Sequence, residues 1–245
     1  MVDIAPGPGR TTFLGHPRTR DQEHFASSGR VNWWDTGWVR TLTEAGRRVI
    51  TIDNRGHGAS QKLYDPADYT APGMAEDAKN LLDHLEIGQA DVMGYSMGAR
   101  IAAFLTINHP ERVRRAVLGG LGDNYFAPPS FASAVPDALL ADDPDTITDR
   151  GAKTFRVFAD QQKQDRVALA ACWRRPRLTL SDAELAAIRQ PVLVICGEKD
   201  AVTGSPERLA ASMPGAVLKI VPGRDHMTAV GDRVTKTEVL GFLGG

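Results

Sequence analysis

Cysteine is scarce in this chain, with only Cys172 and Cys196 among 245 residues. Two cysteines cannot build a disulfide framework, and their positions do not have the spacing of metal ligands. Unpaired thiols are typical of a reducing compartment, so we expect a cytoplasmic protein. No motif for a metal or nucleotide is present, because GPGR and GLGD lack the residues of a phosphate loop. We therefore expect no cofactor.

Long apolar runs and an excess of one charge are also missing. The first residues, MVDIAPGPGR, lack the apolar stretch of a secretion signal, and no run reaches the roughly 18 apolar residues of a membrane span. The formal net charge is −1, which gives no overall attraction to nucleic acid or an anionic membrane. We interpret the basic run WRRPR at 173–177 as a solvated face. The expected partner is a small molecule, and the oligomeric state stays open.

What the sequence does contain is an alternation of β-branched runs with amphipathic segments. Such alternation predicts an α/β fold: a mostly parallel central sheet with helices on both faces. Strands are expected at 49–53, 90–93, 115–120, 191–197 and 216–223, and helices at 33–46, 74–85, 97–108 and 228–243.

Two segments interrupt this pattern. Residues 123–187 are rich in Pro and Asp and then helix-like, which predicts a small helical cap inserted into a core of residues 25–122 and 188–245. Residues 1–24 lack periodicity of either kind and are expected to be irregular, with TTFLGH as the only weak strand candidate.

The stretch VMGYSMGARI places Ser96 between Gly94 and Gly98, after a short strand and before a helix. A nucleophile elbow needs small neighbours at this point, because the turn forces strained backbone angles on the serine. The N–H of Met97, at the start of the helix, would then be free to stabilise an oxyanion. A serine that only caps the helix fits the turn equally well.

A serine nucleophile needs a general base that is oriented by an acid. His226 and Asp200 each follow a predicted strand, in VPGRDHM and GEKDAV. The carboxyl ends of parallel strands meet at one edge of a sheet, so both residues are expected beside Ser96. Their order, Ser then Asp then His, is that of α/β-hydrolases. Asp225 is a weaker alternative acid, since adjacent side chains rarely point the right way.

GYSMGARIAAF, DNRGHGAS, LVICGEKDAV and GRDHM together resemble the α/β-hydrolase superfamily, especially its small serine esterases, lactonases and haloperoxidase-like enzymes. The resemblance covers about residues 25–245. It implies Ser96 as nucleophile, His226 as base, Asp200 as orienting acid and Met97 N–H as an oxyanion donor. It also implies that the loop of Asp53, Arg55 and His57 is structural, and that 123–187 is the cap that sets substrate selectivity.

The sequence departs from this family pattern at its N-terminus. An apolar strand ending in His-Gly is expected there, but Glu23-His24-Phe25 stands in its place, and Phe25 becomes the second oxyanion donor by position. One hypothesis is that residues 1–24 are not the native reading of the gene. The other is a divergent member in which TTFLGH serves as the strand.

The predicted function is a serine hydrolase that cleaves a small carboxylic ester or lactone through an acyl-enzyme. Serine at the elbow, instead of the aspartate of dehalogenases and epoxide hydrolases, favours acyl transfer. Three alternatives stay open: a perhydrolase, a carbon–carbon bond hydrolase with the same triad, and a catalytically silent binding protein. The tryptophans Trp33, Trp34 and Trp38 fit core packing better than a pocket mouth.

Overall fold

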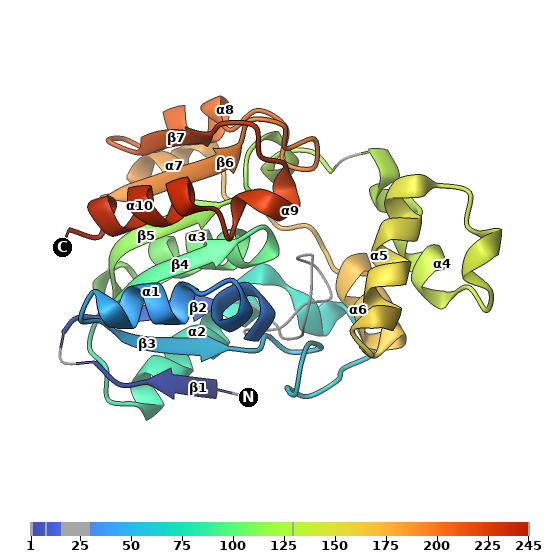
Figure 1. Cartoon of the computed structure of the whole chain (residues 1–245), viewed down its shortest axis with the longest axis horizontal. Coiled ribbons are helices and arrows are strands. Elements are labelled where there is room, and N and C mark those ends of the chain that lie inside the picture. Colours follow the sequence, from blue (N-terminus) through green and yellow to red (C-terminus); the bar gives the residue numbers. More distant parts are fainter. Residues whose placement is uncertain (1, 8, 16–29, 129, 245) are drawn as a thin grey trace.

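The computed structural model describes residues 2–7, 9–15, 30–128 and 130–244. These residues form a seven-stranded sheet in the order β1-β3-β2-β4-β5-β6-β7 (Figure 1). β1 is antiparallel to β3, and the other neighbouring pairs are parallel, which confirms the predicted mostly parallel sheet. The strands are β1 (Val2–Ala5), β2 (Thr11–Gly15), β3 (Arg48–Ile52), β4 (Ala90–Tyr95), β5 (Val113–Gly119), β6 (Val192–Gly197) and β7 (Val217–Val221).

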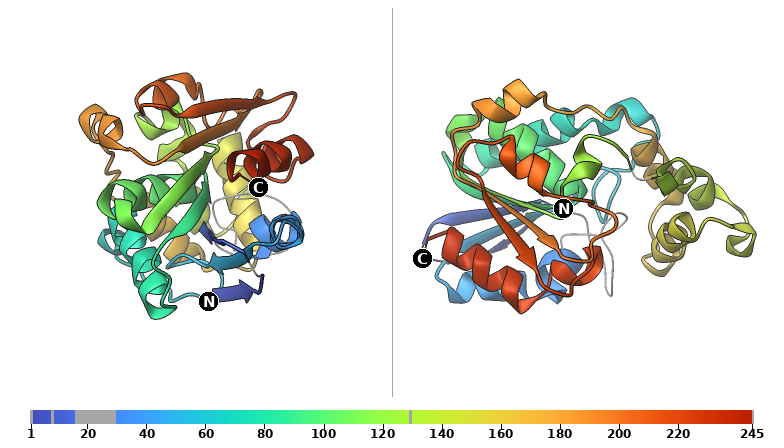
Figure 2. Two further views of the ribbon diagram at one scale, coloured as in Figure 1. Left: turned by 90° about the vertical axis from the view of Figure 1, so that its left-hand side faces the viewer. Right: turned by 90° about the horizontal axis from the view of Figure 1, so that it is seen from above.

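Helices cover both faces of the sheet. α1 (Trp38–Glu44) and α10 (Arg233–Phe242) lie on one face, and α2 (Ala71–His84), α3 (Met97–Asn108) and α7 (Asp182–Ala187) lie on the other (Figures 1 and 2). Two short helices, α8 (Glu207–Ala211) and α9 (His226–Ala229), contact β7 and β6 respectively. No helix in the described part of the chain is long and apolar enough to cross a membrane.

The helix predicted for residues 228–243 is two helices in the structure, α9 and α10. The break occurs because Asp232 adopts an extended backbone and its carboxylate accepts a hydrogen bond from the N–H of Val234 at 2.7 Å. An aspartate in this position starts a new helix.

Three helices within residues 123–187, the segment predicted to be the cap, project from one end of the core (Figure 1). They are α4 (Val135–Leu140), α5 (Arg150–Gln161) and α6 (Arg166–Arg174), and α4 packs against both of the others. The last helix between residues 123 and 187, α7, returns to the core and contacts α3.

Side chains alternate between two hydrophobic clusters along the central strands. On β6, Val192, Val194 and Cys196 pack into the cluster beneath α2 and α3, whereas Leu193 and Ile195 pack into the cluster beneath α1 and α10. A strand buried on both faces has this apolar run without polar interruption. The second cluster also contains Trp33 and Trp38, both 0% exposed, which confirms core packing for these two; Trp34 is 43% exposed.

The expectation that residues 1–24 are irregular is wrong for their described part. β1 pairs with β3 at the sheet edge, and β2 lies in the middle, with Phe13 opposite Ile50 on β3 and Val92 on β4. Residues 11–15 of TTFLGH therefore do supply the strand, as the second hypothesis predicted. Its five residues are too few to show a period, and Thr12, Phe13 and Leu14 are all buried, so no alternation marks them. Residues 16–24 lie outside the described part.

A buried ion cluster ties β2 to its neighbours. Asp91 on β4 is 0% exposed and accepts hydrogen bonds from Arg47, just before β3, and from Arg114 on β5. The Nε of Arg47 also donates to the hydroxyl of Thr12 on β2 at 2.5 Å. One carboxylate thus pairs with two guanidiniums, and the cluster connects four neighbouring strands.

We expect Asp91→Asn to lower the free energy of unfolding by about 3–5 kcal/mol, because it leaves the buried Arg47 and the half-buried Arg114 without a counter-charge. Urea unfolding at neutral pH measures the change. The matched control is Asp83→Asn, since Asp83 pairs with Lys79 and Arg112 but is solvent-exposed. Equal shifts of the urea midpoint in the two variants would contradict the role assigned to Asp91.

Candidate active site

Ser96 occupies a strained turn between β4 and α3. Its φ is 54° and its ψ is −115°, a combination that residues with a side chain rarely adopt. The turn needs glycine at position 94, because a Cβ there would lie 2.1 Å from the carbonyl oxygen of Gly98. The N–H of Ser96 donates to the carbonyl of Gly119 on β5 at 2.8 Å, which holds the turn against the sheet.

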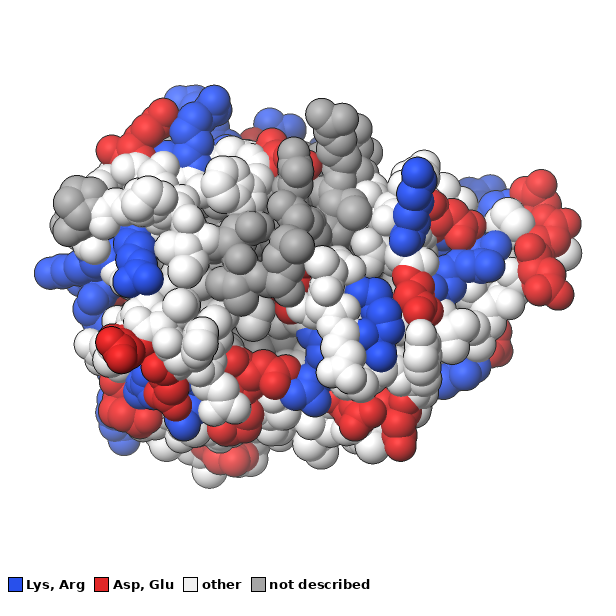
Figure 3. All heavy atoms as spheres, turned by 90° about the horizontal axis from the view of Figure 1, so that it is seen from below, with Lys and Arg blue, Asp and Glu red and all other residues white. Residues whose placement is uncertain are grey.

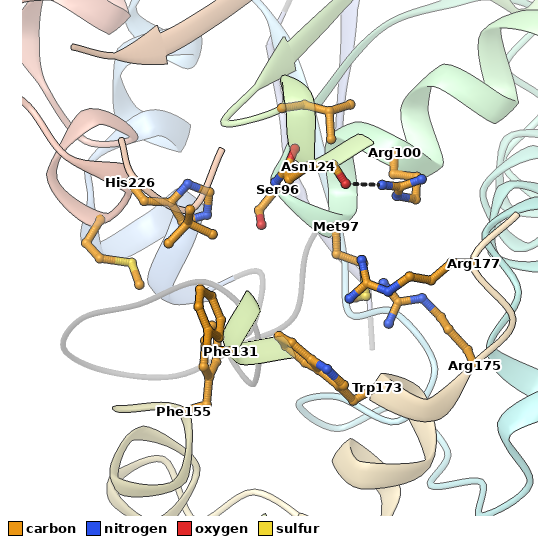
Figure 4. Close-up of a pocket in the computed structure, with 13 residues that line it drawn as sticks. Ser96, Met97, Arg100, Asn124, Phe131, Phe155, Trp173, Arg175, Arg177 and His226 are labelled. Atoms are coloured by element: carbon orange, nitrogen blue, oxygen red, sulfur yellow. Dashed lines mark hydrogen bonds between the residues drawn. The ribbon is translucent and has the colours of Figure 1, made fainter. Parts of the chain in front are cut away.

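The side chain of Ser96 does not cap the helix that follows it. Its hydroxyl makes no capping hydrogen bond to α3, so the alternative of a purely capping serine is not supported. Instead, Ser96 lines a pocket between core and cap, where it faces His226 (Figure 4). Met97 is the first residue of α3, and the first N–H groups of a helix have no acceptor within it.

His226 and Asp200 form a buried pair on the loops after β7 and β6. The Nδ1 of His226 lies 2.7 Å from Oδ2 of Asp200, and the two residues are 4% and 6% exposed. Parallel pairing of β4 to β7 brings these loops to the same sheet edge as Ser96, as the sequence predicted. Asp225 is engaged elsewhere, because its carboxylate accepts hydrogen bonds from the N–H groups of Met227 and Thr228 at the start of α9.

Asp200 is held in place and ionised by its surroundings. Its Oδ1 accepts from the N–H groups of Val202 and Thr203, and its Oδ2 accepts from the Thr203 hydroxyl at 2.6 Å. Burial alone would raise the pKa of Asp200, but the hydrogen bond and the charge of His226, with the Thr203 contacts, lower it below the ordinary value. Sequence reasoning did not anticipate the role of Thr203. Its position in a turn, three residues after Asp200, could have indicated a contact with that carboxylate.

Tyr95 fixes His226 from the other side. Its hydroxyl donates to the carbonyl oxygen of His226 at 2.7 Å, and the two ring centroids are 5.3 Å apart. Close approach of Gly119 and Gly120 to the Tyr95 ring leaves no space for a Cβ at either glycine, since it would lie 2.6 Å from ring carbons. His226 is therefore held at Nδ1 by the Asp200 carboxylate, at its backbone carbonyl by the Tyr95 hydroxyl, and beside its imidazole by the Tyr95 ring.

The DNRGHGAS loop is organised as expected. Asp53 accepts from the N–H of Ala59, and Arg55 pairs with both carboxylate oxygens of Asp77 at 2.6 and 2.7 Å. His57 is 0% exposed and donates from Nδ1 to the carbonyl of Arg55. Burial lowers the pKa of His57 to about 4, so it is neutral at physiological pH.

The rest of the pocket combines apolar and cationic side chains. The cap side contributes Phe131, Phe155 and Trp173, and Figure 4 shows their rings opposite Ser96. Arg175 and Arg177 also line the pocket. Arg175 is half-buried, so the expectation that WRRPR is a solvated face is wrong for this residue, whereas Arg177 is exposed to solvent as expected. In that run only Arg174 pairs outward, with Asp137 at 3.0 Å.

Further residues in the pocket were missed by sequence reasoning. Arg100 projects from the first turns of α3, and Asn124 follows β5. Their sequence context carries no catalytic pattern. Phe25, the expected second oxyanion donor, lies outside the described residues. No group of three or more metal-ligating side chains occurs in the described part of the chain.

Comparison with known proteins gives consistent results. The family model for the alpha/beta hydrolase fold matches residues 24–161. The chain is 33% identical over 198 residues to a 2-hydroxymuconate semialdehyde hydrolase of Pseudomonas sp. (strain CF600), covering 73% of this chain and 69% of that protein. The crystal structure of a hydrolase from Pseudomonas aeruginosa PA01 superposes with a TM-score of 0.78 at 26% identity, covering 100% of this chain and 94% of the other. An enol-lactonase from Burkholderia xenovorans LB400 shares the fold, with a TM-score of 0.72 at 21% identity over 100% and 95% of the two chains.

We expect the Asp200–His226 pair to stabilise the fold only while Asp200 is ionised. Because the pKa of Asp200 is depressed in the folded state, this contribution is present above its ordinary pKa and is lost as pH falls through the lower folded value. The difference in unfolding free energy between wild type and Asp200→Asn should therefore shrink below about pH 4. Urea unfolding of both proteins from about pH 6 to about pH 3 measures it; a pH-independent difference would contradict the assignment.

Proposed function

Because the chain belongs to the alpha/beta hydrolase fold family, we propose that it is a serine hydrolase that cleaves a small carboxylic ester or lactone. The observation that carries this proposal is the geometry around His226. A buried carboxylate lies 2.7 Å from Nδ1 of the imidazole, and the imidazole shares a pocket with a serine held in a strained turn. These are the parts of a nucleophile, a base and an orienting acid.

In the proposed mechanism, the hydroxyl of Ser96 attacks the substrate carbonyl and His226 accepts its proton through Nε2. Asp200 keeps the proton on Nδ1 and stabilises the imidazolium that forms. His226 then protonates the leaving alkoxide. In the second half, water attacks the acyl-enzyme with His226 again as base, and the acid product leaves. The hydrogen bonds to Asp200 and the Tyr95 contact mean that little reorganisation is needed at either step.

The negative charge on the carbonyl oxygen needs donors that are already in place. We propose the N–H of Met97 as one of them, because it lies next to Ser96 at the positive end of α3. Phe25 N–H is proposed as the second donor on sequence position alone. The cap would set substrate selectivity, since Phe131, Phe155 and Trp173 form the wall opposite the serine.

A second candidate comes from the sequence relatives. The 33% identity to a 2-hydroxymuconate semialdehyde hydrolase favours 2-hydroxymuconate semialdehyde as a substrate to test. Its hydrolysis would use the same Ser96, His226 and Asp200. We also propose that the enzyme works in the cytoplasm, since both of its thiols are unpaired and buried. We further propose that it works without a cofactor.

The decisive experiment is covalent labelling of the folded protein with a fluorophosphonate probe. We expect one label per chain on Ser96, and we expect Ser96→Ala to lose both the label and at least about a thousandfold of its turnover of short 4-nitrophenyl esters. Ser212→Ala is the matched control, because the Ser212 hydroxyl caps a carbonyl of α8 outside the pocket. Wild-type protein that folds but takes no label would indicate a catalytically silent binding protein instead.

A further inference from the structure

Three guanidiniums meet in the pocket beside the nucleophile. Arg100 comes from α3, four residues after Ser96, whereas Arg175 and Arg177 come from the segment after α6. Figure 4 shows the guanidiniums of Arg175 and Arg177 side by side next to Met97, with Arg100 above them in this view. Three positive charges in one pocket repel each other, so their surroundings should supply a counter-charge.

The described residues do not supply one. In the described part of the chain, none of the three forms an ion pair with a carboxylate. By contrast, other arginines of the cap are paired: Arg174 with Asp137, and Arg156 with Asp160 at 2.7 Å. Among the described residues, the three pocket arginines therefore differ from these two cap arginines in having no carboxylate partner.

The contacts that the three arginines do make are with neutral groups, and they differ. Arg100 is 6% exposed; its Nη2 donates to the carbonyls of Asn124 and Tyr125 at 2.9 and 3.1 Å, and its guanidinium lies over the Tyr125 ring. Arg175 donates from Nη1 to the carbonyl of Cys172 at 2.6 Å. Arg177 lies with its guanidinium carbon 5.9 Å from the centre of the Trp173 ring. Arg175 and Arg177 keep most of their donors available.

The proximity of these positive charges affects the pKa values of Arg100 and Arg177. Burial, followed by the charges of Arg175 and Arg177, lowers the pKa of Arg100 to about 10. Burial and the charge of Arg175 also lower the pKa of Arg177. A guanidinium group is cationic at neutral pH, so the pocket carries a positive potential that an anion would offset.

We propose that Arg175 and Arg177 bind a carboxylate carried by the substrate, with Arg100 as a fixed positive charge in the same pocket. This inference rests on the proposed function, because it assigns the substrate class of the same pocket: an ester or lactone with a free carboxylate at a distance from the scissile carbonyl. Arginine suits this task, since its planar fork matches the two oxygens of a carboxylate. The aromatic side chains Phe155 and Trp173 would contact the apolar stretch between the two polar groups.

The test compares a neutral and an anionic ester of similar size, 4-nitrophenyl butyrate and mono-4-nitrophenyl glutarate. We expect wild type to have the higher kcat/KM on the glutarate. Arg175→Gln and Arg177→Gln should lower the ratio of the two kcat/KM values by about 10- to 100-fold, the loss expected for one charge-assisted contact. Arg174→Gln is the matched control, because Arg174 directly precedes Arg175 but forms an ion pair with Asp137. This variant should leave the ratio of the two kcat/KM values unchanged.

A binding measurement separates this inference from the proposed function. Calorimetric titration of glutarate into Ser96→Ala protein should show binding that Arg177→Gln weakens about tenfold or more, even if no ester is turned over. Loss of hydrolysis and labelling with retained, Arg177-dependent glutarate binding would sink the serine hydrolase but keep the anion site. Hydrolysis of both esters with no preference for the glutarate, and a ratio that the Arg175 and Arg177 variants do not change, would overturn the anion site alone.

Discussion

Parallel pairing of β4, β5, β6 and β7 is the constraint on which the rest of this structure depends. Each of these strands ends at the same edge of the sheet, so residues more than a hundred positions apart in the chain meet there. Ser96 follows β4, Asp200 follows β6 and His226 follows β7. An antiparallel neighbour would have placed one of them at the opposite edge, some 15–20 Å away for strands of five or six residues. The strand topology thus brings these three residues together, and the contacts between their side chains depend on it.

The strained backbone at Ser96 illustrates how this topology supports chemistry. Such a conformation costs about 1–3 kcal/mol and persists only when surrounding contacts enforce it. Here the Gly94 and Gly98 backbones are in close contact, and the Ser96 N–H is hydrogen-bonded to Gly119 on the neighbouring strand. The strain keeps the hydroxyl from capping α3 and directs it into the pocket, opposite an imidazole that Asp200, Thr203 and Tyr95 hold in one orientation.

The sequence predicted the parallel core well because its strands and helices are long enough to be recognised. β6 is an unbroken apolar run, and α2 has a clear amphipathic period. β2 was only a weak strand candidate because it has five residues, is buried on both faces and follows a Gly- and Pro-rich segment. Its place depends on partners far along the chain: Ile50, Val92 and the Arg47 that reaches Thr12. Such pairings are set by tertiary contact, which a local pattern does not contain.

The arginines of the cap show that side-chain positions in the pocket also depend on tertiary structure and not on a local sequence pattern. Arg174, Arg175 and Arg177 share one short run, and composition alone suggests one solvated surface for all of them. The end of α6 separates them. Arg174 is the last residue of the helix and pairs with Asp137 on α4, whereas Arg175 and Arg177, after the helix, line the same pocket as Ser96. Arg100 adds the third charge from α3 in the core, and it is fixed there by the carbonyls of the loop after β5. Core and cap therefore each supply part of the positive potential, and substrate selectivity depends on how the two are held together.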